Sequence, residues 1–112
     1  MERFVAGDIV VVSFPFTDLS LARKRPALVL ATLDGDDIIL CEITSKIRKD
    51  NYVISLENED LESGFLKVKS IIRPNRLLTI HKNKIKYKFG RIKEFKLEEV
   101  LSKVKEIFIK QL

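Results

Sequence analysis

The chain has 112 residues, 46% of them hydrophobic and 33% charged, which predicts one domain, residues 1–112, with its own core and excludes a disordered protein. Its single cysteine, Cys41, excludes an internal disulfide and a cysteine-based zinc site and fits the reducing cytoplasm, and no apolar run approaches the ~20 residues of a membrane span. Residues 46–112 carry 17 basic and nine acidic side chains, which is typical of a nucleic-acid-binding protein but also of a lysine-rich solvated face.

The first half of the chain predicts three strands. Residues 9–14 are rich in β-branched side chains and form the first strand. A polar loop over 17–25 leads to a second strand over 26–32, where Pro26 is acceptable as the first residue. A tight turn around a glycine connects it to a third strand over 37–43, so the second and third strands form a hairpin.

The second half predicts shorter, more irregular strands. Residues 52–56 form a short strand, and the acidic stretch 57–63 is a turn. Residues 66–73 alternate apolar and polar side chains, and after a bend at a Pro-Asn pair the strand continues over 77–80. Strands bent in this way are common where small barrels turn corners. The cation-rich stretch 81–91 fits a helical turn and a short strand.

A helix is predicted over about 96–110. Apolar residues recur there with helical spacing on one face: Leu97, Val100, Leu101, Val104, Ile107 and Phe108. No Ser, Thr, Asp or Asn stands at the expected N-cap. The predicted fold class is therefore mainly β, a small and strongly bent barrel with one C-terminal helix.

Three stretches of the sequence are informative because of their order and spacing. They are GDIVVVSFPFTDLSLARKRPALVL at the start, then CEITSK, then SIIRPNRLLTI. Together they resemble the MazF/PemK family of toxin endoribonucleases over about residues 6–108. The resemblance implies an SH3-like (CcdB/PemK-like) barrel with a C-terminal helix, usually a homodimer, in the cytoplasm. It also implies cleavage of single-stranded RNA at short sequences, without a metal or other cofactor, by a toxin that a cognate antitoxin neutralises.

By position, the resemblance places the catalytic pair of the family on Arg25 and Thr44. A planar, permanently charged guanidinium suits a phosphate that gains negative charge during cleavage. Pro26 restricts the backbone of the preceding residue and gives Arg25 a defined direction. The hairpin returns both residues to the same side. The alternatives are a surface salt bridge for Arg25 and a turn-capping role for Thr44.

Further polar residues are candidates for RNA binding. Cations near the pair could line a groove for the RNA backbone, and one serine matches a position that the family commonly fills with serine. The candidates are Arg23, Lys24, Ser45, Lys46, Arg48, Lys49, Ser70, Arg73 and Arg76. One departure from the family stands beside them, because Leu78 precedes Thr79 where many members have arginine.

Other readings remain open at this stage. His81 is the one histidine and a possible acid or base, although a surface role is the simpler interpretation. The acidic turn at 34–37 lacks the length and closing glutamate of a calcium loop, so no metal site is expected. A relative on the same fold binds DNA gyrase, and an inactive interaction module is a third possibility.

Overall fold

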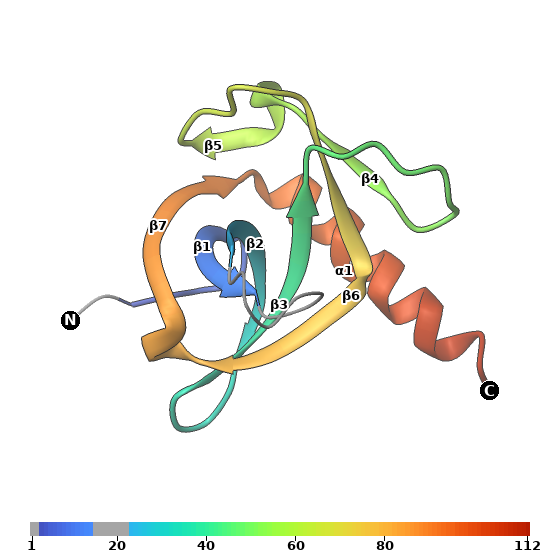
Figure 1. Ribbon diagram of the computed structural model, residues 1–112. Coiled ribbons are helices and arrows are strands. Elements are labelled where there is room, and N and C mark those ends of the chain that lie inside the picture. Colours follow the sequence, from blue (N-terminus) through green and yellow to red (C-terminus); the bar gives the residue numbers. More distant parts are fainter. Residues whose placement is uncertain (1–2, 15–22) are drawn as a thin grey trace.

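The computed structural model describes residues 3–14 and 23–112, which form one curled sheet and a C-terminal helix (Figure 1). The sheet has seven strands in the order β4-β6-β3-β2-β1-β7-β5, and neighbouring strands are antiparallel. The elements are β1 (Asp8–Phe14), β2 (Arg23–Thr32), β3 (Asp37–Thr44), β4 (Ile54–Leu56), the 3₁₀ turn η1 (Asn58–Asp60), β5 (Leu61–Ser63), β6 (Ser70–His81), the 3₁₀ turn η2 (Lys82–Lys84), β7 (Ile85–Ile92) and α1 (Glu94–Ile109). The predicted class, mainly β with a C-terminal helix, is confirmed.

Buried apolar side chains form two clusters, one on each face of the curled sheet. Alternation along β2 and β3 sends successive residues to opposite faces. The larger cluster lies on the face that α1 covers, and it includes Ile9, Leu28, Cys41, Ile43, Leu56, Ile72 and Val100. The second cluster lies on the other face and consists of Val10, Val12, Ala27, Val29, Ile38 and Leu40.

Cys41 behaves as the small buried hydrophobe that its place in an apolar strand predicts. It is a free cysteine, fully buried in the larger cluster. Burial, with a smaller contribution from the neighbouring Glu42 charge, raises the pKa of its thiol to about 12. The thiol is therefore neutral at physiological pH, and its role is packing.

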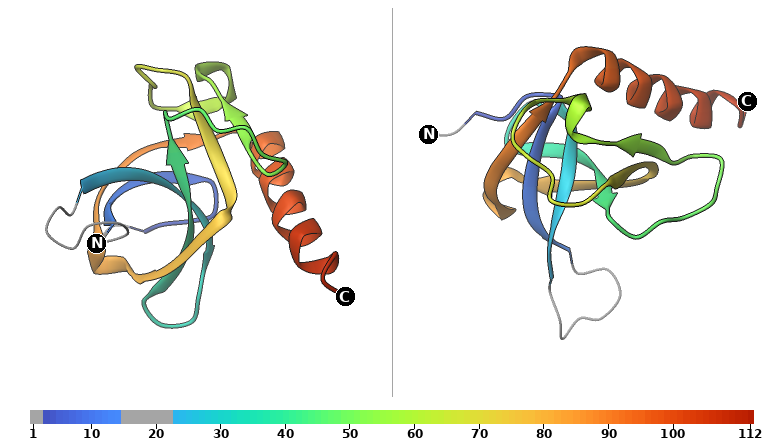
Figure 2. Two further views of the ribbon diagram at one scale, coloured as in Figure 1. Left: turned by 45° about the vertical axis from the view of Figure 1, so that its right-hand side comes forward. Right: turned by 90° about the horizontal axis from the view of Figure 1, so that it is seen from above.

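Helix α1 begins at Glu94, two residues before the predicted start, and its N-cap residue Lys93 provides no side-chain cap. Val100 is fully buried, but Leu101 and Phe108 are 40% and 58% exposed. The apolar face of α1 is therefore only partly buried. Figure 2 shows that the C-terminal turns of α1 extend past the sheet. No helix in residues 3–14 and 23–112 is long and apolar enough to cross a bilayer.

Strand β2 begins at Arg23 rather than at Pro26. Pro26 pairs with Val11 on β1, whereas the ladder with β3 begins only at Ala27. Proline lacks an N–H and is tolerated where one side of a strand has no ladder partner. The position explains why a proline fits inside this strand.

The strand predicted over 66–73, with a bend and a continuation over 77–80, corresponds to β6, which begins at Ser70 and ends at His81. On β3, Cys41 and Glu42 are consecutive, but they pair with Leu77 and Arg73. Residues 74–76 are therefore extra residues in a bulge, which turns the strand and re-aims its side chains. The acidic stretch 57–63, expected to be a turn, contains η1 and the short strand β5.

The Gly-Asp pair at the start of β1 has a structural role. Gly7 has a φ of 99°, a conformation that favours glycine. The carboxylate of Asp8 is buried, where it accepts the backbone N–H of Val5 at 2.9 Å and Nη1–H of Arg91 at 2.9 Å. These contacts tie the chain before β1 to β7.

Candidate functional site

Four residues form a row across the sheet on the face away from α1. Val10 lies opposite Ala27, Ala27 opposite Glu42, and Glu42 opposite Arg73. Directly opposed residues present their side chains on the same face. Val10 and Ala27 belong to the second apolar cluster, so Glu42 and Arg73 continue that apolar face as a charged pair.

Arg25 and Thr44 lie one row further along the same face. Arg25 is two residues before Ala27, and Thr44 is two residues after Glu42, so strand alternation keeps all four side chains on one side. The ladder between β2 and β3 ends at the Ala27–Glu42 pair, so Arg25 and Thr44 each stand two residues beyond it at the same end of the hairpin. Both residues are half-buried, an environment that lets a polar side chain be held by neighbours and still face solvent.

The hydroxyl of Thr44 already has one structural partner. Its Oγ1 accepts the backbone N–H of Lys46 at 3.1 Å, which is the turn-capping interaction considered from the sequence. A hydroxyl can accept and donate at the same time. The Thr44 O–H therefore remains able to donate to a further acceptor, and the turn fixes where its oxygen lies.

Glu42 lies between two arginines. Its Oε1 is 3.8 Å from Nη1 of Arg73, and its Oε2 is 3.6 Å from Nε of Arg76. Glu42 and Arg73 are 5% and 8% exposed, whereas the side chain of Arg76 is 40% exposed. The Nε of Arg73 is buried without a hydrogen-bond partner among the described residues. Glu42 and Arg73 are thus buried together, and Arg76 contacts the same carboxylate from a more exposed position.

An exposed loop with several basic residues, the basic loop, spans residues 45–53 between β3 and β4. Its polar residues are all exposed, and the carboxylate of Asp50 accepts the backbone N–H groups of Tyr52 at 2.8 Å and Val53 at 3.1 Å. Lys24 in β2 is exposed as well. Arg23 lies in β2, but its side chain falls outside the described residues. The exposed candidates are therefore Lys24, Ser45, Lys46, Arg48 and Lys49.

Two residues singled out from the sequence lie away from Arg25 and Thr44. Ser70 pairs with Leu56, a member of the larger cluster, so it faces the opposite side of the sheet; its buried hydroxyl donates to the Val68 carbonyl at 3.2 Å. His81 pairs with Asp37 at the far end of β3. Seven strand steps separate Asp37 from Thr44, about 23 Å at the usual rise.

His81 has a local structural role at that far end. It is exposed, its Nδ1 accepts the backbone N–H of Asn83 at 3.1 Å, and its Nε2 is 3.5 Å from the carboxylate of Asp36. A hydrogen bond from Lys82 is the main cause that lowers the pKa of Asp36. These contacts close the end of the hairpin and agree with the surface reading of His81.

Glu42 is the residue that sequence reasoning missed. The signal was present, because DIILCEIT holds one carboxylate in the middle of an apolar strand, at the same parity as Thr44. A buried carboxylate needs a partner of opposite charge. The partner comes from β6; the Pro74-Asn75 pair indicated a bend there, but the register that sets Arg73 opposite Glu42 has no local sequence pattern.

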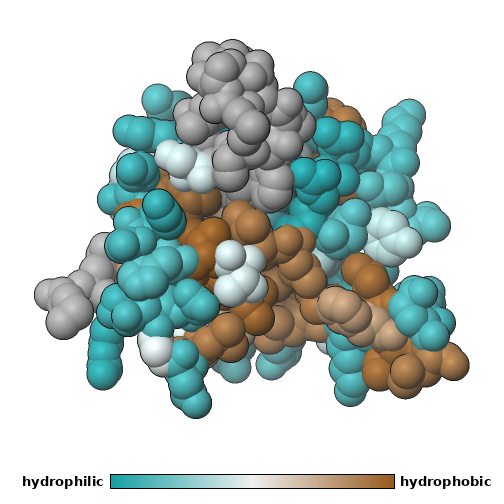
Figure 3. Space-filling view, turned by 60° about the horizontal axis from the view of Figure 1, so that its bottom comes forward, coloured by the Kyte–Doolittle hydropathy of each residue, from teal (hydrophilic) through white to brown (hydrophobic). Residues whose placement is uncertain are grey.

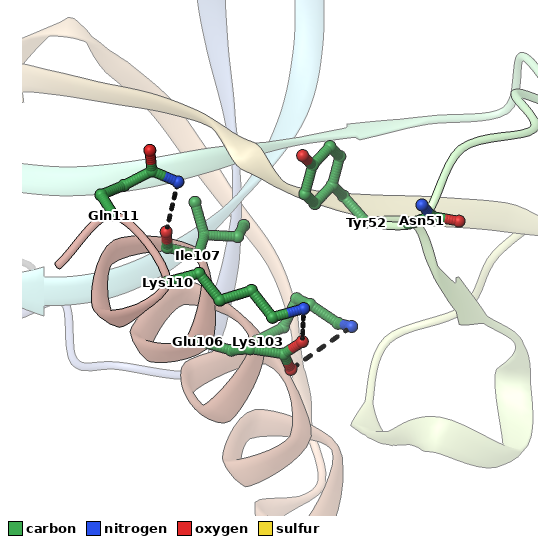
Figure 4. Close-up of a pocket in the computed structure, with 7 residues that line it drawn as sticks. All are labelled: Asn51, Tyr52, Lys103, Glu106, Ile107, Lys110 and Gln111. Atoms are coloured by element: carbon green, nitrogen blue, oxygen red, sulfur yellow. Dashed lines mark hydrogen bonds and ion pairs between the residues drawn. The ribbon is translucent and has the colours of Figure 1, made fainter.

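A cavity of about 230 Å³ lies between the basic loop and the end of α1 (Figure 4). Glu106 binds Lys110 at 2.9 Å and Lys103 at 3.6 Å across its floor. The cavity is lined by Asn51, Tyr52, Lys103, Glu106, Ile107, Lys110 and Gln111. Neither Arg25 nor Thr44 lines this cavity, and neither Glu42 nor Arg73 does. The cavity is therefore separate from the face of the sheet that carries these residues. Within residues 3–14 and 23–112, no group of three His, Cys, Asp or Glu side chains could hold a metal ion.

Comparison with known proteins shows the family to which the chain belongs. Residues 6–108 match the family model described as PemK-like, MazF-like toxin of type II toxin-antitoxin system. No match is found among curated protein sequences.

Solved structures share the fold at low sequence identity. An endoribonuclease in complex with its cognate antitoxin from a Mycobacterial species is 9% identical, covers 91% of each chain and has a TM-score of 0.71. The Mycobacterium tuberculosis toxin MazF-mt6 is 16% identical, with 87% and 90% of the two chains covered and a TM-score of 0.66. A MazE-MazF structure from Deinococcus radiodurans is 17% identical, with 96% and 97% covered and a TM-score of 0.75.

Proposed function

Because the chain belongs to the PemK-like, MazF-like toxin family of type II toxin–antitoxin systems, we propose that it is a sequence-selective, metal-independent endoribonuclease acting on single-stranded RNA in the cytoplasm. The observation that carries the proposal is that Arg25 and Thr44 lie on one face of the sheet, each two residues beyond Ala27–Glu42, the last pair at this end of the β2–β3 ladder. An arginine and a hydroxyl held side by side can bind two oxygens of one phosphate.

In the proposed reaction, the 2′-hydroxyl of RNA attacks its own 3′-phosphate. A P–O bond forms to the 2′-oxygen, the P–O bond to the 5′-oxygen of the next nucleotide breaks, and the products are a 2′,3′-cyclic phosphate and a 5′-hydroxyl. The 2′-hydroxyl proton passes to water, and water returns one to the leaving oxygen. Negative charge grows on the non-bridging oxygens and on the leaving oxygen as the reaction proceeds.

Arg25 stabilises that charge. Its guanidinium stays charged at any working pH and offers a planar fork of donors to phosphate oxygens. Donors fixed in advance at the position of developing charge commonly supply the largest catalytic effect. Thr44 donates its O–H to a second oxygen while Lys46 N–H holds the threonine oxygen in place. The half-buried setting of both residues strengthens these interactions relative to open water.

The exposed cations near this pair provide the surface for flanking phosphates. Strand alternation turns Lys24 to the opposite face from Arg25, so the basic loop after Thr44 provides this surface, with three cations within six residues, namely Lys46, Arg48 and Lys49. Such a surface gives salt-dependent binding that follows the RNA backbone. The same surface suits an acidic segment of a cognate antitoxin, which would occlude Arg25 as it binds.

Exposed apolar side chains support assembly with a partner protein, either an antitoxin or a second copy of the chain. On α1, Phe95, Phe108 and Ile109 are each more than half exposed. Figure 3 shows an apolar area on the face that the lower side of Figure 1 presents, bordered by hydrophilic side chains. Contiguous exposed apolar surface of this kind commonly marks an interface.

The direct test is to incubate the protein with a long RNA of defined sequence in EDTA and to map the new 5′ ends. Discrete cuts with 5′-hydroxyl ends are expected, and Arg25→Ala should remove them. Intact RNA together with inhibited DNA supercoiling would instead favour a gyrase-binding toxin. Intact RNA with normal supercoiling would favour an inactive interaction module.

A further inference from the structure

We propose that the cavity between the basic loop and the end of α1 binds one base of the RNA that flanks the cleavage site. In this cavity the ring of Tyr52 stacks on the base, and the side-chain amides of Asn51 and Gln111 face its polar edge. Two lysines of α1 hold a neighbouring phosphate. The inference rests on the proposed function, because it takes the ligand to be the same single-stranded RNA.

The size of the cavity suits a single planar ring system. Its volume is about 230 Å³, whereas pockets that enclose a drug-sized ligand measure about 300–1,000 Å³. Figure 4 shows Tyr52 and Asn51 of the basic loop on one side of the cavity and the residues of α1 on the other. Tyr52 and Ile107 provide apolar surface from the two sides. A base that enters between the loop and the helix therefore meets an aromatic ring and an aliphatic side chain.

Tyr52 stands on a fixed turn. The carboxylate of Asp50 accepts the backbone N–H groups of Tyr52 at 2.8 Å and Val53 at 3.1 Å, an arrangement that holds the local backbone in one conformation. Tyr52 is 41% exposed, so part of its ring faces solvent. Aromatic rings presented in this way are the usual platforms on which the bases of single-stranded RNA stack.

The polar residues of the lining match the edge of a base. A side-chain amide carries both donor and acceptor groups, as base edges do. Nε2 of Gln111 donates to the carbonyl of Ile107 at 3.2 Å, which orients this amide and leaves its oxygen and one N–H for a ligand. Asn51 is exposed beside Tyr52. One stacking face with two amides favours a base, whereas an apolar anchor of a peptide would require a more enclosed apolar pocket.

Two lysines at the floor of the cavity can bind a phosphate next to that base. Glu106 binds Lys110 at 2.9 Å and Lys103 at 3.6 Å, so both ammonium groups are held at the cavity. An ammonium group has three donors. One contact with the carboxylate therefore leaves each lysine with further donors for a phosphate oxygen.

The basic loop connects this cavity to Thr44. Asn51 is seven residues after Thr44, so their Cα atoms lie no more than about 25 Å apart. In Figures 1 and 2 the loop leaves the end of β3 and extends to the side of the molecule on which α1 ends. A strand bound at Thr44 can reach the cavity along the exposed cations of the loop, which are Lys46, Arg48 and Lys49.

The test compares Tyr52→Ala with Tyr87→Ala, which removes the other tyrosine of the chain, 51% exposed on β7 and outside the cavity. The ligand is an oligonucleotide that extends the mapped cleavage sequence on both sides and carries 2′-O-methyl groups, so that it cannot be cut. We expect Tyr52→Ala to weaken binding about tenfold, as for loss of one base stack. Tyr52→Phe keeps the ring and Tyr87→Ala leaves the cavity intact, so both should bind as the wild type does.

A fluorescent base locates the contact. 2-Aminopurine, whose fluorescence is quenched by stacking, replaces each base of the oligonucleotide in turn. We expect quenching at one position outside the cleavage sequence in the wild type and in Tyr87→Ala, and its loss in Tyr52→Ala. Quenching that survives in Tyr52→Ala would show that another residue stacks on the base, which would overturn the assignment.

The salt dependence of binding tests the phosphate contact. Lys110→Ala should reduce the slope of log K against log salt by about 0.7, the value of one phosphate on a single strand. The matched control is Lys105→Ala, an exposed lysine of α1 outside the cavity, which should leave the slope unchanged. Equal slopes for Lys110→Ala and Lys105→Ala would exclude the contact.

The two proposals fail in different ways. Equal affinity of Tyr52→Ala and the wild type for the extended oligonucleotide overturns the base site, even if Arg25→Ala has abolished cleavage. A change of oligomeric state in Tyr52→Ala with unchanged RNA affinity would assign the cavity to a protein interface and overturn the base site as well. RNA left intact by the wild type overturns the endoribonuclease, and the affinity of that intact RNA for the Tyr52 variants then decides the base site. Both Tyr52 variants keep the turn, because Asp50 binds backbone N–H groups.

Discussion

The side-chain oxygen of Thr44 accepts the backbone N–H of Lys46 at 3.1 Å, so the residue proposed to contact phosphate also closes the turn that starts the basic loop. Thr44→Val removes both functions and keeps the shape. We expect loss of about 1 kcal/mol in unfolding free energy, with a fall in cleavage rate. Thr44→Ser keeps the hydroxyl and should therefore retain most of the unfolding free energy and most of the cleavage rate. Urea unfolding and single-turnover cleavage measure the two effects, and an active Thr44→Val enzyme would exclude the catalytic role.

Arg25 should resist conservative replacement. Lysine keeps the charge but not the planar fork that matches two phosphate oxygens. We expect Arg25→Ala to lower the single-turnover rate by about 10²–10³-fold, as for loss of one preorganised donor, and Arg25→Lys to recover only a small part. Lys49→Ala, at an exposed position of the loop that follows Thr44, should weaken binding and leave the rate at saturating RNA unchanged. Equal rates for Arg25→Lys and the wild type would contradict bidentate binding.

The buried Lys96 should be essential for the attachment of α1. It is 6% exposed, its Nζ donates to the carbonyl of Ser55 at 3.1 Å, and it pairs with Glu99 at 3.1 Å and Asp60 at 3.7 Å. Lys96→Ala leaves Asp60 buried without its cation and should cost about 3 kcal/mol in unfolding free energy. The exposed Lys105→Ala should change it by less than about 0.5 kcal/mol. Equilibrium denaturation measures the unfolding free energy of both variants, and equal values for Lys96→Ala and Lys105→Ala would contradict the prediction.

Cys41 should make the protein sensitive to alkali. Its pKa is about 12 in the folded chain against an ordinary value of 9.0, so the buried neutral thiol stabilises the fold fully below pH 9 and progressively less between pH 9 and 12. At pH 10 the loss should be about 1.4 kcal/mol, the value of one pKa unit. The Cys41→Ala variant lacks this titration, so its stability should fall less between pH 8 and 10. Parallel pH curves for the two proteins would show that the thiol ionises normally.

Local sequence patterns predicted most of the secondary structure. β-Branched runs, a tight glycine turn and helical periodicity are short-range signals, and they identified β1, the β2–β3 hairpin and α1. Because a hairpin returns its ends to one side, the neighbourhood of Arg25 and Thr44 also followed from the sequence. Their catalytic role rests on the family resemblance and stays a prediction.

The register between distant strands was decided only in the folded molecule. Whether Ser70 and Arg73 face the same side as Thr44 depends on how β6 pairs with β3, and one step of register exchanges the two faces. The observed pairing places Ser70 in the larger cluster and Arg73 beside Glu42. A bulge of three residues then carries Arg76 to the same carboxylate. The sequence by itself determined the elements and the hairpin, because those depend on neighbouring residues. Tertiary pairing determined the charged row, because burial of a carboxylate among apolar strands is favourable only when distant arginines meet it.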